Sequence, residues 1–448
     1  MAIPPQNILL ALATISGVTT HLALYRHGEW DVRAPKIAAI YILLLLAAMT
    51  TDLMQEPSET QATKPQFAAL KAVLCHITGV YGSIIVYRAL FHRLSRFPGP
   101  FLAGLSNIYV TALSARKLHL YEEVEKLHKR YSDYVRLGPT ELSITNPKAI
   151  QALYSSEAKV SKGPWDKREH TRRRKVWDQG FSSRALQGYE PRVSHYTDQL
   201  INAIEQNLGS PMDDAYILKQ LHADMKMIGL FSHLTWLFPF FKRIPGVNAD
   251  YLKFWKWVGG RVEGRIKNFS DCPDVFSWIL KAYDQGRKSN QDTLNLHGDA
   301  YLIIIDGLQE RSYDKLANLN LLNAVINEAL RLHPAVPSGT QRMTPPEGIT
   351  ISNTHIPGDV MVCVPVHSVF REPELVKDPS TFIPFNSGPY SCVGKQLALI
   401  ELRQVVFEVL IQYNLSFAPG QTESTYLDGK QDTFTLVTAP LNLVFHKR

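Results

Sequence analysis

A cysteine framed by glycines carries the strongest chemical signal in the sequence. It lies in the segment PFNSGPYSCVGKQLALIELR, residues 384–403, where turn-forming residues lead to Cys392 and Gly394 then begins a run of good helix formers. The thiol is therefore expected beside the unpaired N–H groups of a helix N-terminus, which favours a thiolate and hence nucleophilic or metal-binding chemistry. Gly388 and Gly394 would let the backbone approach a flat cofactor closely. Without this setting, a single cysteine is more often a small buried hydrophobic residue.

The same residues resemble a known signature. The pattern Phe385-x-x-Gly388-x-x-x-Cys392-x-Gly394 is similar to the heme-binding motif of the cytochromes P450, and the resemblance extends from about residue 96 to the end of the chain. It implies a cytochrome P450-like fold and heme b (iron protoporphyrin IX) as cofactor, with Cys392 as the iron ligand that pushes electron density toward bound oxygen. The family usually has Arg or His two residues before the cysteine, where this chain has Tyr390.

A charged pair upstream of the cysteine has a structural counterpart in the same family. Glu328 and Arg331 are three residues apart, on one face of a predicted helix and within pairing reach. Such a pair is usually an ordinary surface pair, but the flanking Leu and Ile residues suggest burial. The sequence resembles the Glu-x-x-Arg helix that braces the cysteine loop. The family adds an Arg from a Pro-Glu-Arg-Phe-like segment, which is missing here because Arg371-Glu-Pro runs through residues 376–379 directly into Phe382-Ile-Pro-Phe385.

Further candidates for cofactor binding are basic. In the family, a helix with an aromatic residue and an Arg four residues later contacts a heme propionate, and this chain has His170 and Arg174 at those places. Arg342 resembles another propionate ligand. The forked guanidinium group of an arginine pairs well with a carboxylate, so Arg174 and Arg342 both suit a heme propionate. The run over residues 166–177 is otherwise a solvated helix face, and we expect no nucleic acid partner. Its other basic residues could dock an acidic protein partner: Lys167, Arg168, Arg172, Arg173 and Lys175.

The sequence departs from the family where oxygen activation needs protons. Residues 296–307 look like the first half of the family's long distal helix, which continues as Ala-Gly-x-(Asp/Glu)-Thr-Thr and relays protons. Here Asp306 is the nearest acid and Ser312 the nearest hydroxyl. An internal loss is therefore expected near residues 307–315. The absent Pro-Glu-Arg-Phe-like segment predicts another near residues 373–384, and a third is expected near residues 213–225, where the helices before the family's substrate lid should lie. A degenerate gene, a mispredicted splice form and a divergent enzyme all remain open explanations.

The elements that must position these residues are mostly helical. Apolar periodicity predicts helices over residues 119–132, 166–179, 185–208, 249–268, 275–285, 294–306, 316–333 and 394–413. Short extended runs predict strands over residues 134–137, 141–144, 360–364 and 441–445. The fold class is therefore mainly α with small β-sheets.

Residues 1–95 are expected to form a membrane anchor, and residues 96–448 a heme-binding body. Ile3–Tyr25 contains no Asp, Glu, Lys or Arg, Ile37–Met54 contains a long apolar run, and Phe67–Phe91 is a third apolar stretch, which Lys71 and His76 weaken. Each is long enough to cross about 30 Å of hydrocarbon, so two or three transmembrane helices are predicted. A cleaved signal peptide is the alternative, but its positive n-region and small-residue cleavage site are missing.

Charge and cysteine content limit the location. Lys and Arg number 48 against 41 Asp and Glu, and the resulting net charge of +7 suggests an anionic membrane surface or an acidic partner. Arginines flank the first and third apolar segments, which places the body in the cytosol by the positive-inside tendency, as in an endoplasmic reticulum protein. The four cysteines have scattered spacings, so a disulfide framework or a zinc site is not expected.

The resemblance implies a heme-thiolate monooxygenase of fungal secondary-metabolite type. Such an enzyme inserts oxygen from O2 into an apolar small molecule, with electrons from NADPH that arrive through NADPH-cytochrome P450 reductase. Two alternatives remain: a heme-thiolate protein that is catalytically impaired or inactive, and a membrane protein too shortened to bind heme.

Overall fold

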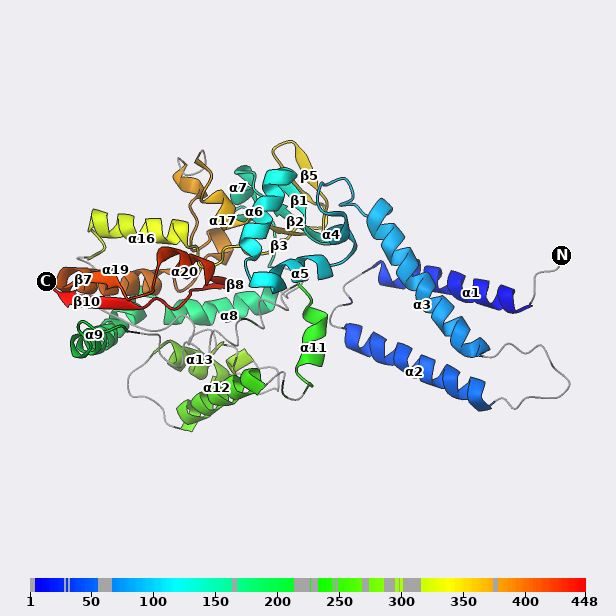
Figure 1. Cartoon of the computed structure of the whole chain (residues 1–448), viewed down its shortest axis with the longest axis horizontal. Coiled ribbons are helices and arrows are strands. Elements are labelled where there is room, and N and C mark those ends of the chain that lie inside the picture. Colours follow the sequence, from blue (N-terminus) through cyan, green and yellow to red (C-terminus); the bar gives the residue numbers. More distant parts are fainter. Residues whose placement is uncertain are drawn as a thin grey trace. The chain divides into compact units, whose positions relative to one another are not determined.

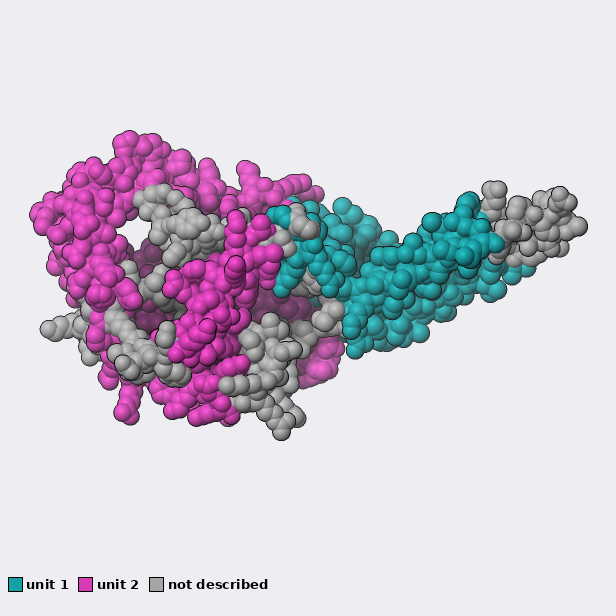
Figure 2. Space-filling model, turned by 90° about the horizontal axis from the view of Figure 1, so that it is seen from below, with its two compact units in different colours: residues 1–112, 136–140, 231–246 teal, residues 113–135, 141–230, 247–448 magenta. Residues whose placement is uncertain are grey.

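The protein is mainly helical with small β-sheets (Figure 1), as the sequence predicts. The computed structural model describes residues 5–27, 30, 33–54, 67–162, 167–212, 226, 233–244, 246, 249–267, 274–285, 295–297, 299–300, 316–373 and 378–448. The chain divides into two compact units, which Figure 2 colours separately: residues 1–112, 136–140 and 231–246 form the first, and residues 113–135, 141–230 and 247–448 form the second.

Three apolar helices make up most of the first unit. They are α1 (Pro5–Thr20), α2 (Ala34–Met54) and α3 (Ala68–Val86), and the π-helical turns η1 (His21–Tyr25) and η3 (Tyr87–Phe91) extend α1 and α3. The segments Asn7–Tyr25, Ala34–Met54 and Ala68–Phe91 contain 19, 21 and 24 residues and are long and apolar enough to cross a membrane. Most of their large apolar side chains are exposed, as lipid-facing residues should be. All three expected spans are therefore candidates.

Helices α1 and α3 cross closely because glycines remove side chains at the contact. A Cβ atom at Gly17 would lie 2.1 Å from the carbonyl oxygen of His76, and a Cβ at Gly79 would lie 2.2 Å from a carbonyl oxygen of α1. The His76 ring also bonds Ser16 Oγ through Nδ1 at 2.7 Å and Tyr41 Oη through Nε2 at 3.2 Å, which joins α1, α2 and α3. Small residues and interhelical polar bonds are the features that stabilise helix packing in membranes.

The helices of the body follow the sequence-based expectations closely. Predictions over residues 119–132, 166–179, 185–208, 249–268, 275–285, 316–333 and 394–413 are confirmed, and most of 294–306 lies outside the described residues. The helices are α4 (Phe101–Leu105), α5 (Ile108–Lys117), α6 (Leu120–Arg130), α7 (Lys148–Tyr154), α8 (Lys167–Gly180), α9 (Ser183–Gln206), α11 (Phe238–Phe241), α12 (Ala249–Lys267), α13 (Val275–Gln285), α16 (Asn320–Leu332), α17 (Val366–Val369), α19 (Lys395–Gln412) and α20 (Glu423–Asp428), with 3-10 turns η4 (Thr235–Leu237), η5 (Pro379–Thr381) and η6 (Gly388–Tyr390).

Within the part of the chain that the structure describes, the strands are short and form four small sheets. One sheet has the order β1 (Tyr134–Arg136), β2 (Glu141–Ile144), β6 (Met361–Cys363) and β3 (Arg342–Met343), with β2 and β6 parallel and β3 antiparallel to β6. The others are the antiparallel pairs β4 (Ile349–Ile351) with β5 (Thr354–Ile356), β7 (Tyr413–Phe417) with β10 (Leu443–Lys447), and β8 (Gln431–Thr433) with β9 (Thr435–Val437). The strands predicted from sequence are all present; β3, β4, β5, β7, β8 and β9 were not predicted.

A hydrophobic core joins four helices of the second unit. It contains Trp177 of α8, Val258 of α12, Ile279 of α13 and Leu397 of α19, all buried. The buried positions of α19 recur at Leu397, Ile400 and Gln404, spacings of three and four that place them on one helical face. This packing fixes the start of α19, and so fixes the position of the cysteine loop that precedes it.

The α1–α3 contact generates a prediction. We expect Gly79→Leu to separate the two helices, because the new side chain would overlap the backbone of α1, whereas Gly82→Leu is a matched control since no atom lies within 4 Å of a Cβ there. Overpacking of this kind costs about 1–3 kcal/mol. Thermal unfolding of the detergent-solubilised full chain, followed by size-exclusion chromatography, should show a lower midpoint for Gly79→Leu alone. Equal midpoints for the two variants would contradict the contact.

Candidate functional site

The Cys392 loop is held by its own backbone. The Cys392 N–H donates to the carbonyl oxygen of Phe385 at 2.8 Å, and the Ser391 N–H donates to the carbonyl oxygen of Gly388 at 3.1 Å. Helix α19 begins three residues after the cysteine, with Gly394 as its N-cap. The loop thus places an exposed thiol just before a helix N-terminus, as the sequence indicates.

Gly388 has a structural role that the sequence did not indicate. Its φ is +65°, a left-handed conformation, and a Cβ there would lie 2.6 Å from the carbonyl oxygens of both Tyr154 and Ser155. The loop therefore lies directly against the end of α7. A Cβ at Gly394 would meet Cys392 Sγ at 3.9 Å, an ordinary contact, so the described chain by itself does not require glycine at that position.

Burial separates Cys392 from the other cysteines. Cys75, Cys363 and Cys392 are not joined to one another by disulfides, and Cys272 lies outside the described residues. Burial raises the pKa of the Cys363 thiol far above its ordinary value, and nearby Glu141 adds to the effect. Cys392 is exposed, and among these three it alone combines exposure with a glycine-framed loop in the body.

Two of the predicted basic residues lie at this loop. Arg174 donates from Nη1 to the carbonyl oxygen of Ser391 at 2.7 Å, and its Nε donates to Asp178 at 2.7 Å. Arg342 is buried with its guanidinium carbon 5.1 Å from the centre of the Tyr390 ring, and its Nε has no hydrogen-bond partner. Burial lowers the pKa of Arg342. The prediction for the His170 side chain lies outside the described residues.

Lys162 is a third cation at the loop, and the sequence analysis missed it. Its ammonium lies 5.8 Å from the centre of the Tyr390 ring. Partial desolvation lowers its pKa, and repulsion from Arg342 and Arg174 lowers it further. Lys162 precedes the cysteine by 230 positions and belongs to no helix or named strand, so periodicity and spacing gave no signal for it.

The Glu328–Arg331 pair forms as predicted, but its expected burial is wrong for Glu328. Arg331 Nε and Nη2 donate to the two carboxylate oxygens of Glu328 at 2.8 and 2.7 Å, and these bonds lower the pKa of Glu328. The Glu328 side chain is 54% exposed, against 23% for Arg331. Helix α16 buries Leu322 and Ile326 instead. Its apolar Leu321 and Val325 are exposed, so the flanking hydrophobic residues do not mark a buried pair.

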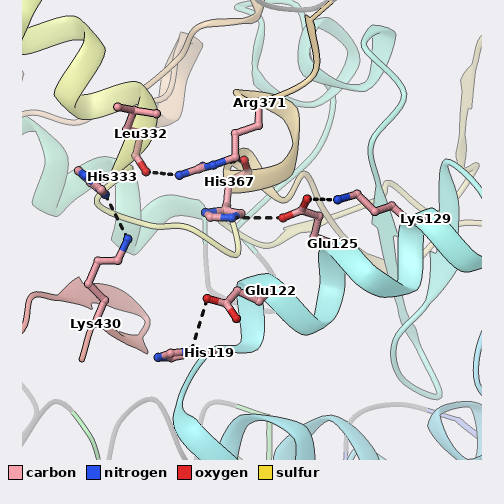
Figure 3. Close-up of polar contacts among 9 residues, drawn as sticks. All are labelled: His119, Glu122, Glu125, Lys129, Leu332, His333, His367, Arg371 and Lys430. Carbon is pink, nitrogen blue, oxygen red and sulfur yellow. Dashed lines mark hydrogen bonds and ion pairs between the residues drawn. The ribbon is translucent and has the colours of Figure 1, made fainter. Parts of the chain in front are cut away.

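Two arginines link the end of α16 to the end of α17 in both directions. Arg331 Nη1 donates to the carbonyl oxygen of Phe370 at 2.8 Å, and Arg371 Nη2 donates back to the carbonyl oxygen of Leu332 (Figure 3). A cation at the last carbonyls of a helix is favourable, because those groups lack intrahelical partners. This reciprocal arginine pair therefore supports the C-terminal end of α16.

Figure 3 shows that helix α6 is connected to the same region. Glu125 lies 3.3 Å from His367 Nε2 of α17 and 2.5 Å from Lys129 Nζ, and Lys430 Nζ bonds His333 Nδ1 at 3.2 Å. Burial, reinforced by Arg371, lowers the pKa of His367 to about 3. His367 is therefore neutral at physiological pH and adds no positive charge beside Glu125.

The expected proton-relay residues are not part of the described site. Asp306 and Ser312 both lie outside the described residues. The nearest described acid toward the N-terminus is buried Asp299, whose Oδ1 accepts hydrogen bonds from Arg173 and, at 3.3 Å, from Trp177 Nε1. Burial raises the pKa of Asp299, and Arg173 opposes this shift. Asp299 therefore stabilises the position of α8 through these two hydrogen bonds.

Comparisons with known proteins agree on one kind of relative. The family model described as Cytochrome P450 matches residues 302–445. A cytochrome P450 monooxygenase of Eupenicillium brefeldianum is 40% identical over 85% of this chain and 97% of its own length. Another, from Fusarium pseudograminearum, is 38% identical over 98% of this chain and 97% of its own, and the tryprostatin B 6-hydroxylase of Aspergillus fumigatus is 28% identical over 98% and 96%.

A solved structure gives the fold. A crystal structure of a cytochrome P450 superposes with a TM-score of 0.56 at 16% sequence identity, and the match covers 75% of this chain and 96% of that chain.

The alignment to the Fusarium relative extends over 543 residues, which is longer than the chain of 448. Residues of that relative therefore stand opposite internal gaps in this chain.

The two members of the α16 pair should differ in importance. Arg331→Ala leaves the carbonyl of buried Phe370 without its donor, which costs about 1–3 kcal/mol, whereas Glu328→Ala removes only an exposed partner. We expect the melting temperature of the full chain in detergent to fall more for Arg331→Ala. Equal decreases would contradict the assignment of support to the Phe370 bond.

Proposed function

The chain belongs to the cytochrome P450 family, and from this we propose that it is a membrane-anchored heme-thiolate monooxygenase whose iron is held by Cys392. The observation that carries the proposal is the exposed Cys392 thiol, presented by the Phe385–Gly394 loop at the start of α19. The fungal relatives, which are named cytochrome P450 monooxygenases, support the same reaction class.

The residues around Cys392 fit heme b. Its iron needs a thiolate, and its two propionates need cations or hydrogen-bond donors. Arg342 offers a buried Nε with no partner, and Arg174 lies beside the cysteine loop. When bound, the heme would supply the oxygen chemistry. The chain would hold the iron through Cys392, orient the propionate edge through Arg342 and Arg174, and place Phe385, Gly388 and Gly394 along the ligand loop.

The membrane arrangement supports a lipid-borne substrate. Residues 1–95 would anchor residues 96–448 to the endoplasmic reticulum, with the body in the cytosol, where NADPH-cytochrome P450 reductase delivers electrons. The apolar spans and the arginines that follow the first and third support this location. An apolar small molecule of fungal secondary metabolism is the proposed substrate. One relative is named tryprostatin B 6-hydroxylase, and this name assigns to that relative the hydroxylation of a small molecule.

A second candidate function is a heme-binding protein with impaired catalysis. The alignment of 543 residues against a chain of 448 supports internal losses, proposed near residues 213–225, 307–315 and 373–384. Exposed Leu321 and Val325 on α16 also favour losses, since these side chains are 79% and 46% exposed on a helix that should be covered. Asp306 remains the proposed substitute acid.

Replacement of Cys392 tests the main proposal. We expect Cys392→Ala to abolish the thiolate-type Soret band of the reduced, CO-bound protein, because no other described cysteine of the body is exposed. Cys363→Ala is the matched control and should keep the band, since that thiol is buried. A thiolate-type band that survives in Cys392→Ala would refute the assignment.

Catalytic coupling separates the two candidate functions. We expect this chain to form product about a hundredfold more slowly, and with less product per NADPH consumed, than a version with a complete Ala-Gly-x-Asp-Thr-Thr helix, because a positioned proton donor contributes roughly that factor to the rate. Loss of the residual turnover in Asp306→Asn would identify Asp306 as the substitute acid. Comparable coupling in the two full chains would mean that the missing relay is dispensable.

A further inference from the structure

We propose that Lys162, together with Arg342, binds a carboxylate of the heme and so supplies the positive charge that Tyr390 cannot supply. This inference deepens the proposed function and depends on it. Tyr390, a residue type with no cationic form, stands two residues before Cys392, where the family usually has Arg or His. The charge on this side of the cysteine loop must therefore come from another segment of the chain.

An isolated backbone bridge brings Lys162 close to Arg342. Ser161 and Met343 form this antiparallel bridge, in which the Ser161 N–H donates to the Met343 carbonyl oxygen at 3.0 Å and the Met343 N–H donates to that of Ser161 at 2.8 Å. Lys162 follows Ser161 and Arg342 precedes Met343, so the two cations lie on the same side of the bridge. The two cations therefore share one location, although 180 positions separate them in the sequence.

Both side chains reach the same tyrosine ring. The Lys162 ammonium lies 5.8 Å from the centre of the Tyr390 ring, and the Arg342 guanidinium carbon lies 5.1 Å from it. A tyrosine face attracts a cation weakly, by about 0.5–1 kcal/mol at exposed sites. Two like charges beside one ring repel each other. Although Lys162 is exposed and water screens part of this repulsion, a bound carboxylate would offset it directly.

No carboxylate of the described residues neutralises this pair. The charged groups that act on Lys162 are Arg342, Arg174 and Cys392. Arg342 bonds the Gln341 carbonyl oxygen at 2.9 Å and retains a buried Nε without a partner. Arg174 differs, because Asp178 already forms an ion pair with it at 2.7 Å. The unneutralised charge beside Cys392 is thus concentrated on Lys162 and Arg342.

The experiment compares heme with its dimethyl ester, whose propionates carry no charge. The full chain, Lys162→Gln and the control Lys159→Gln are each reconstituted in detergent with both cofactors, and the rate of cofactor transfer to apomyoglobin is measured. Lys159 is an exposed lysine three residues away. We expect Lys162→Gln to lose heme at least about tenfold faster than the control, as a lost charge-assisted bond implies, while dimethyl ester loss stays within twofold. Lys162→Arg should restore slow heme loss.

Each other outcome overturns the inference in a distinguishable way. Heme loss from Lys162→Gln at the control rate would mean that Lys162 does not bind the cofactor. An equal acceleration for heme and its dimethyl ester would mean that Lys162 only supports the fold. A thiolate-type spectrum in the unaltered chain shows in both cases that the heme-thiolate ligation of the proposed function stands. Absence of that spectrum from the unaltered chain would instead refute the proposed function, and the inference with it.

Discussion

The Cys392 sulfur is positioned by backbone hydrogen bonds and close backbone contacts, and the rest of the body depends on that constraint. The Cys392 N–H donates to the carbonyl oxygen of Phe385, and Arg174 of α8 donates to the carbonyl oxygen of the residue before the cysteine. Gly388 lies against the carbonyl oxygens at the end of α7. A shift of any of these segments would move the sulfur. Helices α7, α8 and α19 therefore act together as the frame of the proposed iron site.

Helix α16 stabilises this frame through its contacts with α19 and with the end of α17. Near its start, Asn323 accepts a hydrogen bond from Arg403 of α19 at 2.7 Å, and at its end the reciprocal arginine pair of Arg331 and Arg371 joins it to α17. Contacts at both ends restrain the helix. Leu321 and Val325 of α16 are nevertheless exposed to water, and burial of such side chains would contribute about 1.5–3 kcal/mol each.

Local patterns in the sequence determined the class of fold and indicated Cys392 as the proposed iron ligand. The spacing of Phe385, Gly388, Cys392 and Gly394 indicated the family, which the relatives confirm, because a ligand loop of fixed geometry needs fixed residue types. Helices with continuous periodicity, such as residues 275–285, were predicted to the residue, since their amphipathic faces are encoded over a few turns. The apolar anchor segments were equally evident from length and composition.

Only the tertiary structure decided which distant residues meet. The bridge that brings Lys162 close to Arg342 and the bond from Arg371 to Leu332 join segments that no local pattern connects. Strand β3 contains two residues, too few for an alternating pattern, and exists because β6 pairs with it. The exposure of Glu328 likewise depends on what packs against α16. Sequence encodes the faces of helices, whereas the partners of those faces are chosen by packing.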